Sequence, residues 1–151
     1  MYKIGIAASA DAHAIEWELQ ALFSSMPGKP VLSLVDDMDA GEYDILLIHE
    51  QSTVAAAADT VVLNSDESGP QSIVPGQARR LIITYGFNSK ASITASSVFE
   101  GLCCICVQRA FTTPSGLMRE NQELTIPSRN APITLAALAV ALVTDWDMGD
   151  F

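Results

Sequence analysis

Residues 81–98 mark a change of pattern in the middle of the chain. A short apolar run at 81–84 ends at Tyr85 and Gly86, and a second β-prone segment at 91–98 comes after a polar break. This order predicts a strand, a turn and a second strand. Before it, apolar runs alternate with helical patterns, and most of the chain after it is typical of antiparallel strands closed by a helix.

The first half of the chain predicts a largely parallel sheet. Residues 12–23 carry apolar side chains at helical spacing, and Ser9 or Asp11 is a candidate cap for that helix. Residues 44–50 are apolar on both faces, as a central strand covered on both sides requires. Strands are also expected at 2–8, 31–35 and 60–63, with at most a helical turn at 55–58 and a loop with at most one helical turn at 71–80. We therefore expect a three-layer α/β fold with a mostly parallel sheet.

The second half is expected to add antiparallel strands and a closing helix. Residues 101–111 and 117–126 are β-prone and are separated by turn-forming residues, so they predict a hairpin. Residues 131–143 are rich in alanine and leucine and predict a helix. Asn130 is a plausible cap for this helix, and Pro132 falls in its first turn.

Length and charge limit the classes of function. A chain of 151 residues suits one domain spanning 1–151, with residues 144–151 expected to fray as an acidic tail. The formal charge of −10 repels a phosphate backbone and anionic lipid headgroups. We therefore expect neither a nucleic acid nor a membrane as partner. An unknown small molecule or protein is the expected partner, and self-association is left open.

The apolar runs and the cysteines indicate a reducing cytoplasmic setting. No apolar run reaches the roughly 20 residues of a spanning helix, and residues 1–9 begin a strand rather than a signal peptide. Cys103, Cys104 and Cys106 share one expected strand, whose alternation places Cys103 on the opposite face from the other two. They lack the spacing of a zinc site, so packing as reduced thiols is favoured over metal or redox chemistry.

Several blocks of the sequence resemble conserved motifs of one enzyme family. Residues 61–67 resemble "v-v-N-x-D-D", residues 81–87 resemble "v-i-T-[YF]-G-[FL]", and residues 127–142 resemble "l-p-G-x-H-N-v-x-N-a-l-A-A-l-A-a-a". A weaker match, 44–52, is similar to "D-x-x-V-x-E-x-S-S". In this order the blocks resemble the central, ATP-binding domain of the Mur ligases, which add amino acids to the bacterial cell-wall peptide. The resemblance implies that domain's fold.

The phosphate-binding loop of that family is replaced. Mur ligases have a G-T-N-G-K-[ST] loop after the first strand, because backbone N–H groups and a lysine must hold the phosphates. Residues 7–13 of this chain contain neither glycine nor lysine, and Asp11 would repel a triphosphate. We also expect no counterpart of the family's N-terminal and C-terminal domains within residues 1–151. We therefore expect a shortened central domain without catalytic residues, and no cofactor, because the loop disfavours ATP and magnesium.

The resemblance still implies positions for a nucleotide site and a metal ligand. The metal ligand would be Glu50, and the nucleotide-binding positions would be Ser9, Asp11, His13, Asn64 and Asp66. Simpler interpretations compete with these. Asn64 and Asp66 suit a polar turn that bonds its own backbone. His49 and Glu50 suit a sheet-edge pair facing solvent, and His13 suits an exposed helix start rather than an acid-base or metal cluster with Asp11, Glu16 and Glu50.

Three hypotheses for function arise from these observations. The first is a non-catalytic Mur-ligase-like module with a binding or regulatory role, linked to cell-wall metabolism by resemblance alone. The second is a small-molecule binder for a nucleotide or nucleotide-sugar, or a weak ligase-like enzyme. The third is an assembly module that pairs with itself or with a ligase through the β-rich surface around residues 103–107.

Overall fold

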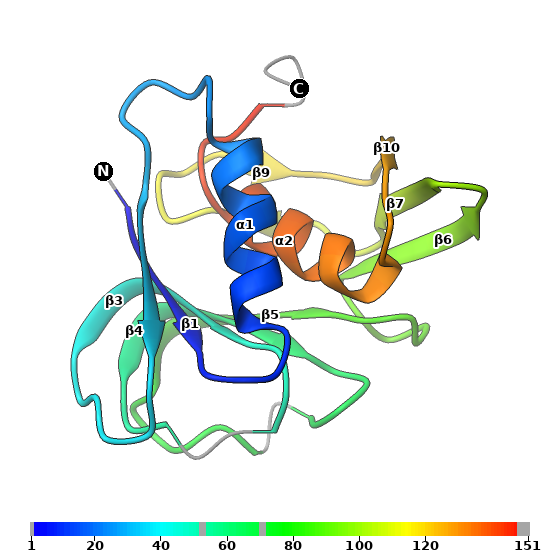
Figure 1. Cartoon of the computed structure of the whole chain (residues 1–151). Coiled ribbons are helices and arrows are strands. Elements are labelled where there is room, and N and C mark those ends of the chain that lie inside the picture. The colour runs from blue at the N-terminus through cyan, green and yellow to red at the C-terminus, as the bar shows by residue number, and fades with distance from the viewer. Residues whose placement is uncertain (1, 52–53, 70–71, 148–151) are drawn as a thin grey trace.

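The computed structural model describes residues 2–51, 54–69 and 72–147. They form an eight-stranded mixed sheet in the order β10-β7-β6-β5-β4-β3-β1-β2, together with two helices (Figure 1). The parallel part consists of β1 (Lys3–Ala7), β2 (Val31–Val35), β3 (Glu42–Ile48), β4 (Ala57–Asn64) and β5 (Ala78–Tyr85). The antiparallel part consists of β6 (Ile93–Phe99), β7 (Leu102–Val107) and β10 (Gln122–Pro127). The α/β class and the mostly parallel sheet are thus confirmed.

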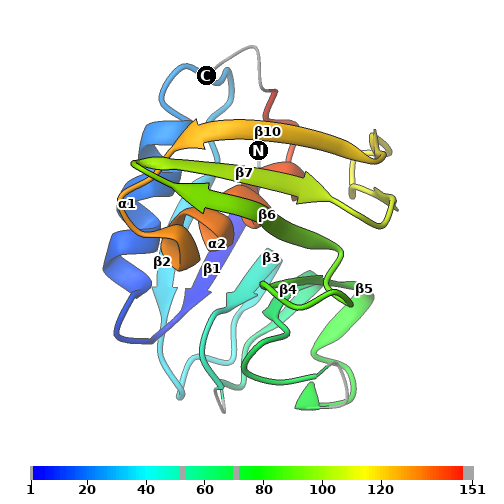
Figure 2. The same cartoon turned by 90° about the vertical axis from the view of Figure 1, so that its right-hand side faces the viewer.

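The two parts of the sheet join between β5 and β6. These strands run parallel and pair at one position only, Tyr85 with Ile93. Past this junction β6, β7 and β10 lie side by side and curl over the helices (Figure 2). The expected pairing of the two late segments is confirmed, because β10 runs antiparallel to β7. Each expected segment is interrupted, however. Between β7 and β10 the chain forms the small separate sheet of β8 (Phe111–Thr112) and β9 (Met118–Arg119).

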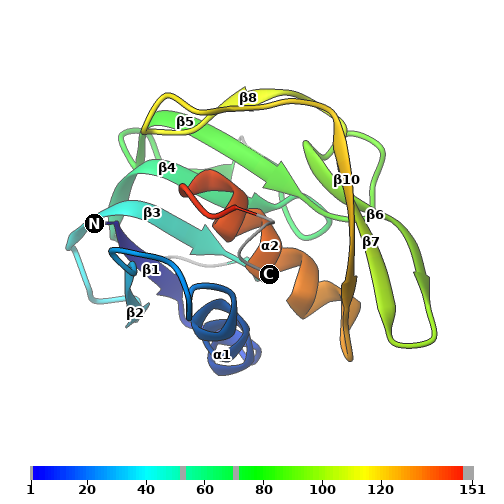
Figure 3. The ribbon, with the colours of Figure 1, turned by 90° about the horizontal axis from the view of Figure 1, so that it is seen from above.

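Helix α2 (Ala131–Val143) is the centre of the core. Its bounds match the expected helix, Pro132 lies in its first turn, and the Asn130 side chain accepts a hydrogen bond from the Ile133 N–H at 3.3 Å. Every residue from Ile133 to Val143 is buried, because the sheet wraps around this helix (Figure 3). Neither this helix nor the other one in the described ranges is long and apolar enough to span a membrane.

The expected three layers are reduced to two layers of regular structure. Helix α1 (Ala12–Leu22) packs against α2, and both helices belong to one buried cluster on one face of the sheet. The cluster on the other face contains no helical residue among those described. Loop residues such as Val54 and Ala56 cover that face, and the Gln77 side chain donates to both of their carbonyl oxygens at 2.9 Å. The connection at 49–56 is too short to form a helix that would bury an apolar stripe, and the connection at 65–77 contains the helix-breaking residues Gly69, Pro75 and Gly76.

Two strand predictions in the middle of the chain were too short. Residues 57 and 58 begin β4, where a helical turn at most was expected, and residues 78–80 belong to β5 rather than to a loop. Both extensions are stabilised by pairing between neighbours, since Ala58 pairs with Ala78. Local sequence carries little of this signal, because the alanines and arginines there are weak strand formers.

The prediction of a frayed tail is wrong for residues 144–147. Trp146 is 1% exposed, and its indole N–H donates to the Leu22 carbonyl oxygen at 3.0 Å. The Arg119 guanidinium donates to the carbonyl oxygens of Leu142, Thr144 and Trp146 at 2.9, 3.0 and 2.6 Å. These bonds satisfy carbonyl groups that the end of α2 would otherwise leave without partners. Residues 148–151 lie outside the described part of the chain.

Candidate functional site

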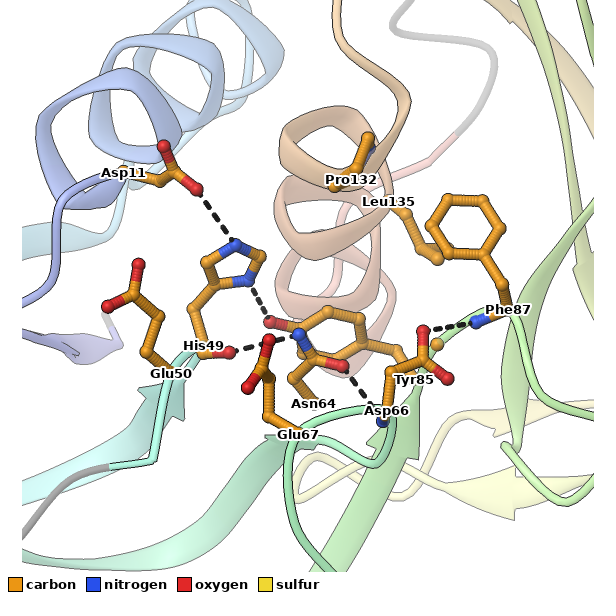
Figure 4. A pocket seen from close by; sticks show the side chains of 11 residues that line it. Asp11, His49, Glu50, Asn64, Asp66, Glu67, Tyr85, Phe87, Pro132 and Leu135 are labelled. Atoms are coloured by element: carbon orange, nitrogen blue, oxygen red, sulfur yellow. Dashed lines mark hydrogen bonds and ion pairs between the residues drawn. The ribbon is translucent and has the colours of Figure 1, made fainter.

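A pocket of about 260 Å³ lies where the carboxyl ends of β3, β4 and β5 meet the first turns of both helices (Figure 4). Open parallel sheets place their ligands at this edge, because the loops after the strands converge there. The pocket has an apolar wall and an acidic rim. The wall is formed by Phe87, Pro132 and Leu135, and the rim carboxylates belong to Asp11, Glu50, Asp66 and Glu67.

His49 forms the floor of the pocket between Tyr85 and Asp11. Its Nδ1 lies 2.6 Å from the Tyr85 hydroxyl oxygen, and its Nε2 lies 3.3 Å from Asp11 Oδ2. The nearby Asp11 carboxylate favours the tautomer of His49 that carries its proton on Nε2. In that tautomer of the neutral ring Nδ1 is an acceptor, and the Tyr85 hydroxyl donates to it. The expectation of a solvent-facing His49 is wrong, because only 5% of this residue is exposed.

The Tyr85 hydroxyl is held in its protonated form. Burial raises the pKa of Tyr85 far above its ordinary value, and the carboxylates of Asp66 and Asp11 add to the effect. The ring is 1% exposed and nearly parallel to His49, with an angle of 4° between the planes and 6.1 Å between the centroids. Tyr85 therefore fixes the orientation of the His49 ring through its protonated hydroxyl.

The Asp11 side chain contacts His49 and does not cap its own helix. It occupies the N-cap position of α1, but its side chain makes no capping hydrogen bond to the helix. The carboxylate instead lies over the pocket and pairs with His49. A group that commonly caps a helix start is thus turned toward the site.

Asn64 ties the ends of two neighbouring strands together. Its Oδ1 accepts a hydrogen bond from the Asp66 N–H at 3.0 Å, which is the expected turn contact. Its Nδ2 also donates to the His49 carbonyl oxygen at 2.9 Å. Both ends of the amide are therefore engaged within the protein.

Asp66 clamps the loop that comes after β5. Its carboxylate accepts hydrogen bonds from the Phe87 N–H at 2.7 Å, from the Asn88 N–H at 3.2 Å and from Asn88 Nδ2 at 2.7 Å. This contact requires glycine at position 86, because a Cβ there would lie 2.8 Å from the Asp66 carboxylate. The sequence predicted that Asp66 bonds only the backbone of its own turn. Its side chain instead contacts residues that come after β5, the neighbouring strand.

The structure brings together part of the predicted site. Asp11, Glu50, Asn64 and Asp66 all line the pocket. Ser9 and His13 do not, since His13 is exposed and the Ser9 hydroxyl is buried without a hydrogen bond to any described residue. Sequence reasoning missed the wall of Phe87, Pro132 and Leu135, and it did not give Tyr85 a role. The position of Tyr85 at the end of a buried strand was the available signal.

Metal binding at Glu50 stays a prediction. Among the described residues, no three His, Cys, Asp or Glu side chains lie close enough together to hold a metal ion. The cluster of His13, Asp11, Glu16 and Glu50 considered from the sequence therefore does not form a metal site in this part of the chain. Magnesium bound with a nucleotide requires only one or two protein carboxylates, so the prediction for Glu50 does not depend on a group of three such side chains.

The cysteines show the expected alternation along β7. Cys103 is buried beneath α2, and Cys104 and Cys106 are half-buried on the opposite face. Burial raises the pKa of Cys103 and of Cys106, which disfavours the thiolate. All three are free thiols.

Comparison with known proteins adds no assignment. No protein-family model matches the chain, and no curated protein matches it.

Proposed function

We propose that this chain is a non-catalytic binding module whose carboxyl-edge pocket holds a small neutral or positively charged ligand. The observation that carries the proposal is the Asp11 carboxylate, which lies over the pocket and is held there by His49 at 3.3 Å. If the resemblance to the Mur ligases reflects descent, this module retains their central scaffold, and a link to cell-wall metabolism is part of the proposal.

The electrostatics of the pocket support a ligand without a triphosphate. Four carboxylates line the pocket, and none of the described residues that line it is Lys or Arg. A triphosphate is bound by oriented N–H groups, lysine and magnesium, which together offset its charge. The acidic rim produces a negative electrostatic potential, which repels a phosphate group.

The shape of the pocket supports a small ligand with an apolar part. Its volume of about 260 Å³ lies below the usual range for drug-sized ligands, roughly 300–1,000 Å³. Phe87 is 46% exposed and stands beside Leu135 at the pocket wall, while Glu50 and Glu67 line the pocket on the other side of His49 and Tyr85 from Phe87. An aromatic or aliphatic amine matches both surfaces, because its apolar body contacts the wall and its ammonium group lies at the rim.

The alternative of a nucleotide or nucleotide-sugar binder receives less support. The two residues that the resemblance places beside the adenine, Asn64 and Asp66, already use their side chains in internal hydrogen bonds. Binding a base would require them to break those bonds. The assembly alternative also loses part of its surface, because Cys103, Ile105 and Val107 are buried beneath α2.

Calorimetric titration with phenethylammonium tests the ligand class. We expect saturable binding that weakens roughly fivefold in Glu50→Gln and in Glu67→Gln, since each change removes about 1 kcal/mol of ion-pair energy at an exposed rim. Glu123→Gln, an exposed glutamate on β10, is the matched control and should bind as the wild type does. Equal affinity in all four proteins would show that the acidic rim does not select the ligand.

An ATP turnover assay tests the absence of catalysis. The purified protein should release no phosphate from ATP above background, with or without magnesium, and Glu50→Gln should change nothing. Magnesium-dependent turnover that Glu50→Gln abolishes would overturn the proposal and would establish Glu50 as a metal ligand.

A further inference from the structure

A second cavity, of about 520 Å³, lies on the face of the sheet opposite α2. Ile82 and Thr84 of β5 point into it, whereas Ile83 and Tyr85 of the same strand pack toward α2. Alternation along the strand therefore separates this cavity from the acidic pocket. The loop between β5 and β6 forms part of its wall through Asn88 and Lys90.

The charge of this cavity is opposite to that of the acidic pocket. Lys90 and Arg109 line it, and none of its described lining residues is acidic. The whole chain has only 8 Lys and Arg residues against 18 Asp and Glu residues. Two cations at one cavity without a carboxylate therefore depart clearly from the average composition of the chain.

Neither cation has an ion-pair partner in the described part of the chain. Arg79 pairs with Glu42 and Asp59, and Arg119 donates to three carbonyl oxygens at the end of α2. Lys90 and Arg109, like the other Lys and Arg residues besides Arg79, make no ion pair with any described residue. Both charges are therefore available to a ligand or to solvent.

Hydroxyl groups complete a set of donors around the cavity. Thr84 Oγ1 accepts a hydrogen bond from the Ser92 N–H at 3.1 Å, which leaves the Thr84 O–H group available as a donor. The Ser92 side chain also lines the cavity. A guanidinium, an ammonium and hydroxyl donors are the groups that bind phosphate oxygens in proteins, where charge-assisted hydrogen bonds dominate.

We propose that this cavity binds the phosphate group of a small molecule through Lys90, Arg109 and the hydroxyl groups of Thr84 and Ser92. A phosphate is favoured over a carboxylate because it carries more acceptor oxygens and a larger negative charge, and the cavity presents several donors around its rim. The site is distinct from the acidic pocket. The Asp66–Asn88 hydrogen bond of 2.7 Å lies between the two, so one loop borders both.

An amide NMR titration with inorganic phosphate and with phenyl phosphate, each against chloride at equal ionic strength and pH, tests the site. We expect saturable shifts in the segment 88–92 and at Arg109, with no change at His49. Tighter binding of phenyl phosphate would identify an organic phosphate that also uses the Ile82 wall. Equal binding of both probes would identify the phosphate group alone as the ligand.

Variants separate a specific site from general attraction. Lys90→Gln and Arg109→Gln should each weaken phosphate binding about tenfold, because each removes a charge-assisted donor. Lys29→Gln, with the same charge change in the turn before β2, should bind as the wild type does. Equal weakening in all three variants, or shifts that do not saturate, would refute the proposal. Neither result would affect the amine proposal, which concerns the other pocket.

Discussion

Tyr85→Phe tests the hydrogen-bonded floor of the acidic pocket. The substitution keeps the ring and removes only the hydroxyl that lies 2.6 Å from His49 Nδ1. Since both residues are buried, water cannot easily replace the lost donor. An acceptor left buried without a partner costs about 1–3 kcal/mol.

The cost should be visible as a clear loss of thermal stability. For a chain of this size 1 kcal/mol corresponds to about 2–4 °C in Tm. Tyr85→Phe should therefore lower Tm by about 2–12 °C, and the free energy of unfolding in urea should fall by about 1–3 kcal/mol with an unchanged m-value. An unchanged m-value shows that the substitution does not alter the surface exposed on unfolding.

Tyr43→Phe provides the matched comparison. The Tyr43 hydroxyl donates to Asp39 Oδ2 at 2.7 Å, but the Asp39 carboxylate also accepts a hydrogen bond from the Gly41 N–H, so it keeps a partner. Its removal should cost less than about 1 kcal/mol at neutral pH. The reasoning about the pocket floor would be refuted if Tyr85→Phe were no more destabilising than Tyr43→Phe.

Three further predictions concern groups outside the pocket floor. Burial raises the pKa of Glu18, so its ionised form destabilises the fold: Glu18→Gln should raise Tm at pH 7, and the gain should vanish below about pH 4. Burial also raises the pKa of Tyr43 to about 12, so the stability contributed by its protonated hydroxyl is complete below about pH 10 and is lost as the pH rises toward 12. Tyr43→Phe should remove this loss, which amounts to up to about 1.4 kcal/mol of unfolding free energy per pH unit in urea unfolding. Arg119→Met should cost about 2–4 kcal/mol and red-shift the fluorescence of Trp146 in a Trp17→Phe background, whereas unchanged emission would contradict the buried tail.

The sequence was sufficient for most elements of the fold. Both helices and the early strands have local signals, such as the capping Asn130 and the doubly apolar run at 44–48. The number of layers was not predictable in this way, because it depends on whether connections that cross the sheet are long enough to form helices. The buried tail was missed for a similar reason: Trp146 and its partner Arg119 are far apart in sequence, and neither has a local pattern that signals the contact.

The site was predictable where strand ends determine it. Asp11, Glu50, Asn64 and Asp66 come after parallel strands or at their ends, so topology alone brings them to one edge. The role of each side chain was not predictable. Whether Asp11 caps its own helix or pairs with His49 depends on a few ångströms between two loops. The basic cavity was missed because Lys90 and Arg109 become neighbours only through the pairing of β6 with β7.

The acidic pocket and the basic cavity can be separated in one measurement, an amide NMR titration with ATP in the presence and absence of magnesium. We predict no magnesium-dependent change at His49, Asn64 or Gly86. We also predict that any effect of the phosphates is confined to residues 88–92 and Arg109 and that its affinity falls about tenfold in Lys90→Gln. Saturable, magnesium-dependent shifts at His49 and Gly86 that disappear in Glu50→Gln would contradict the proposed function, because they would show that the acidic pocket still binds a nucleotide triphosphate.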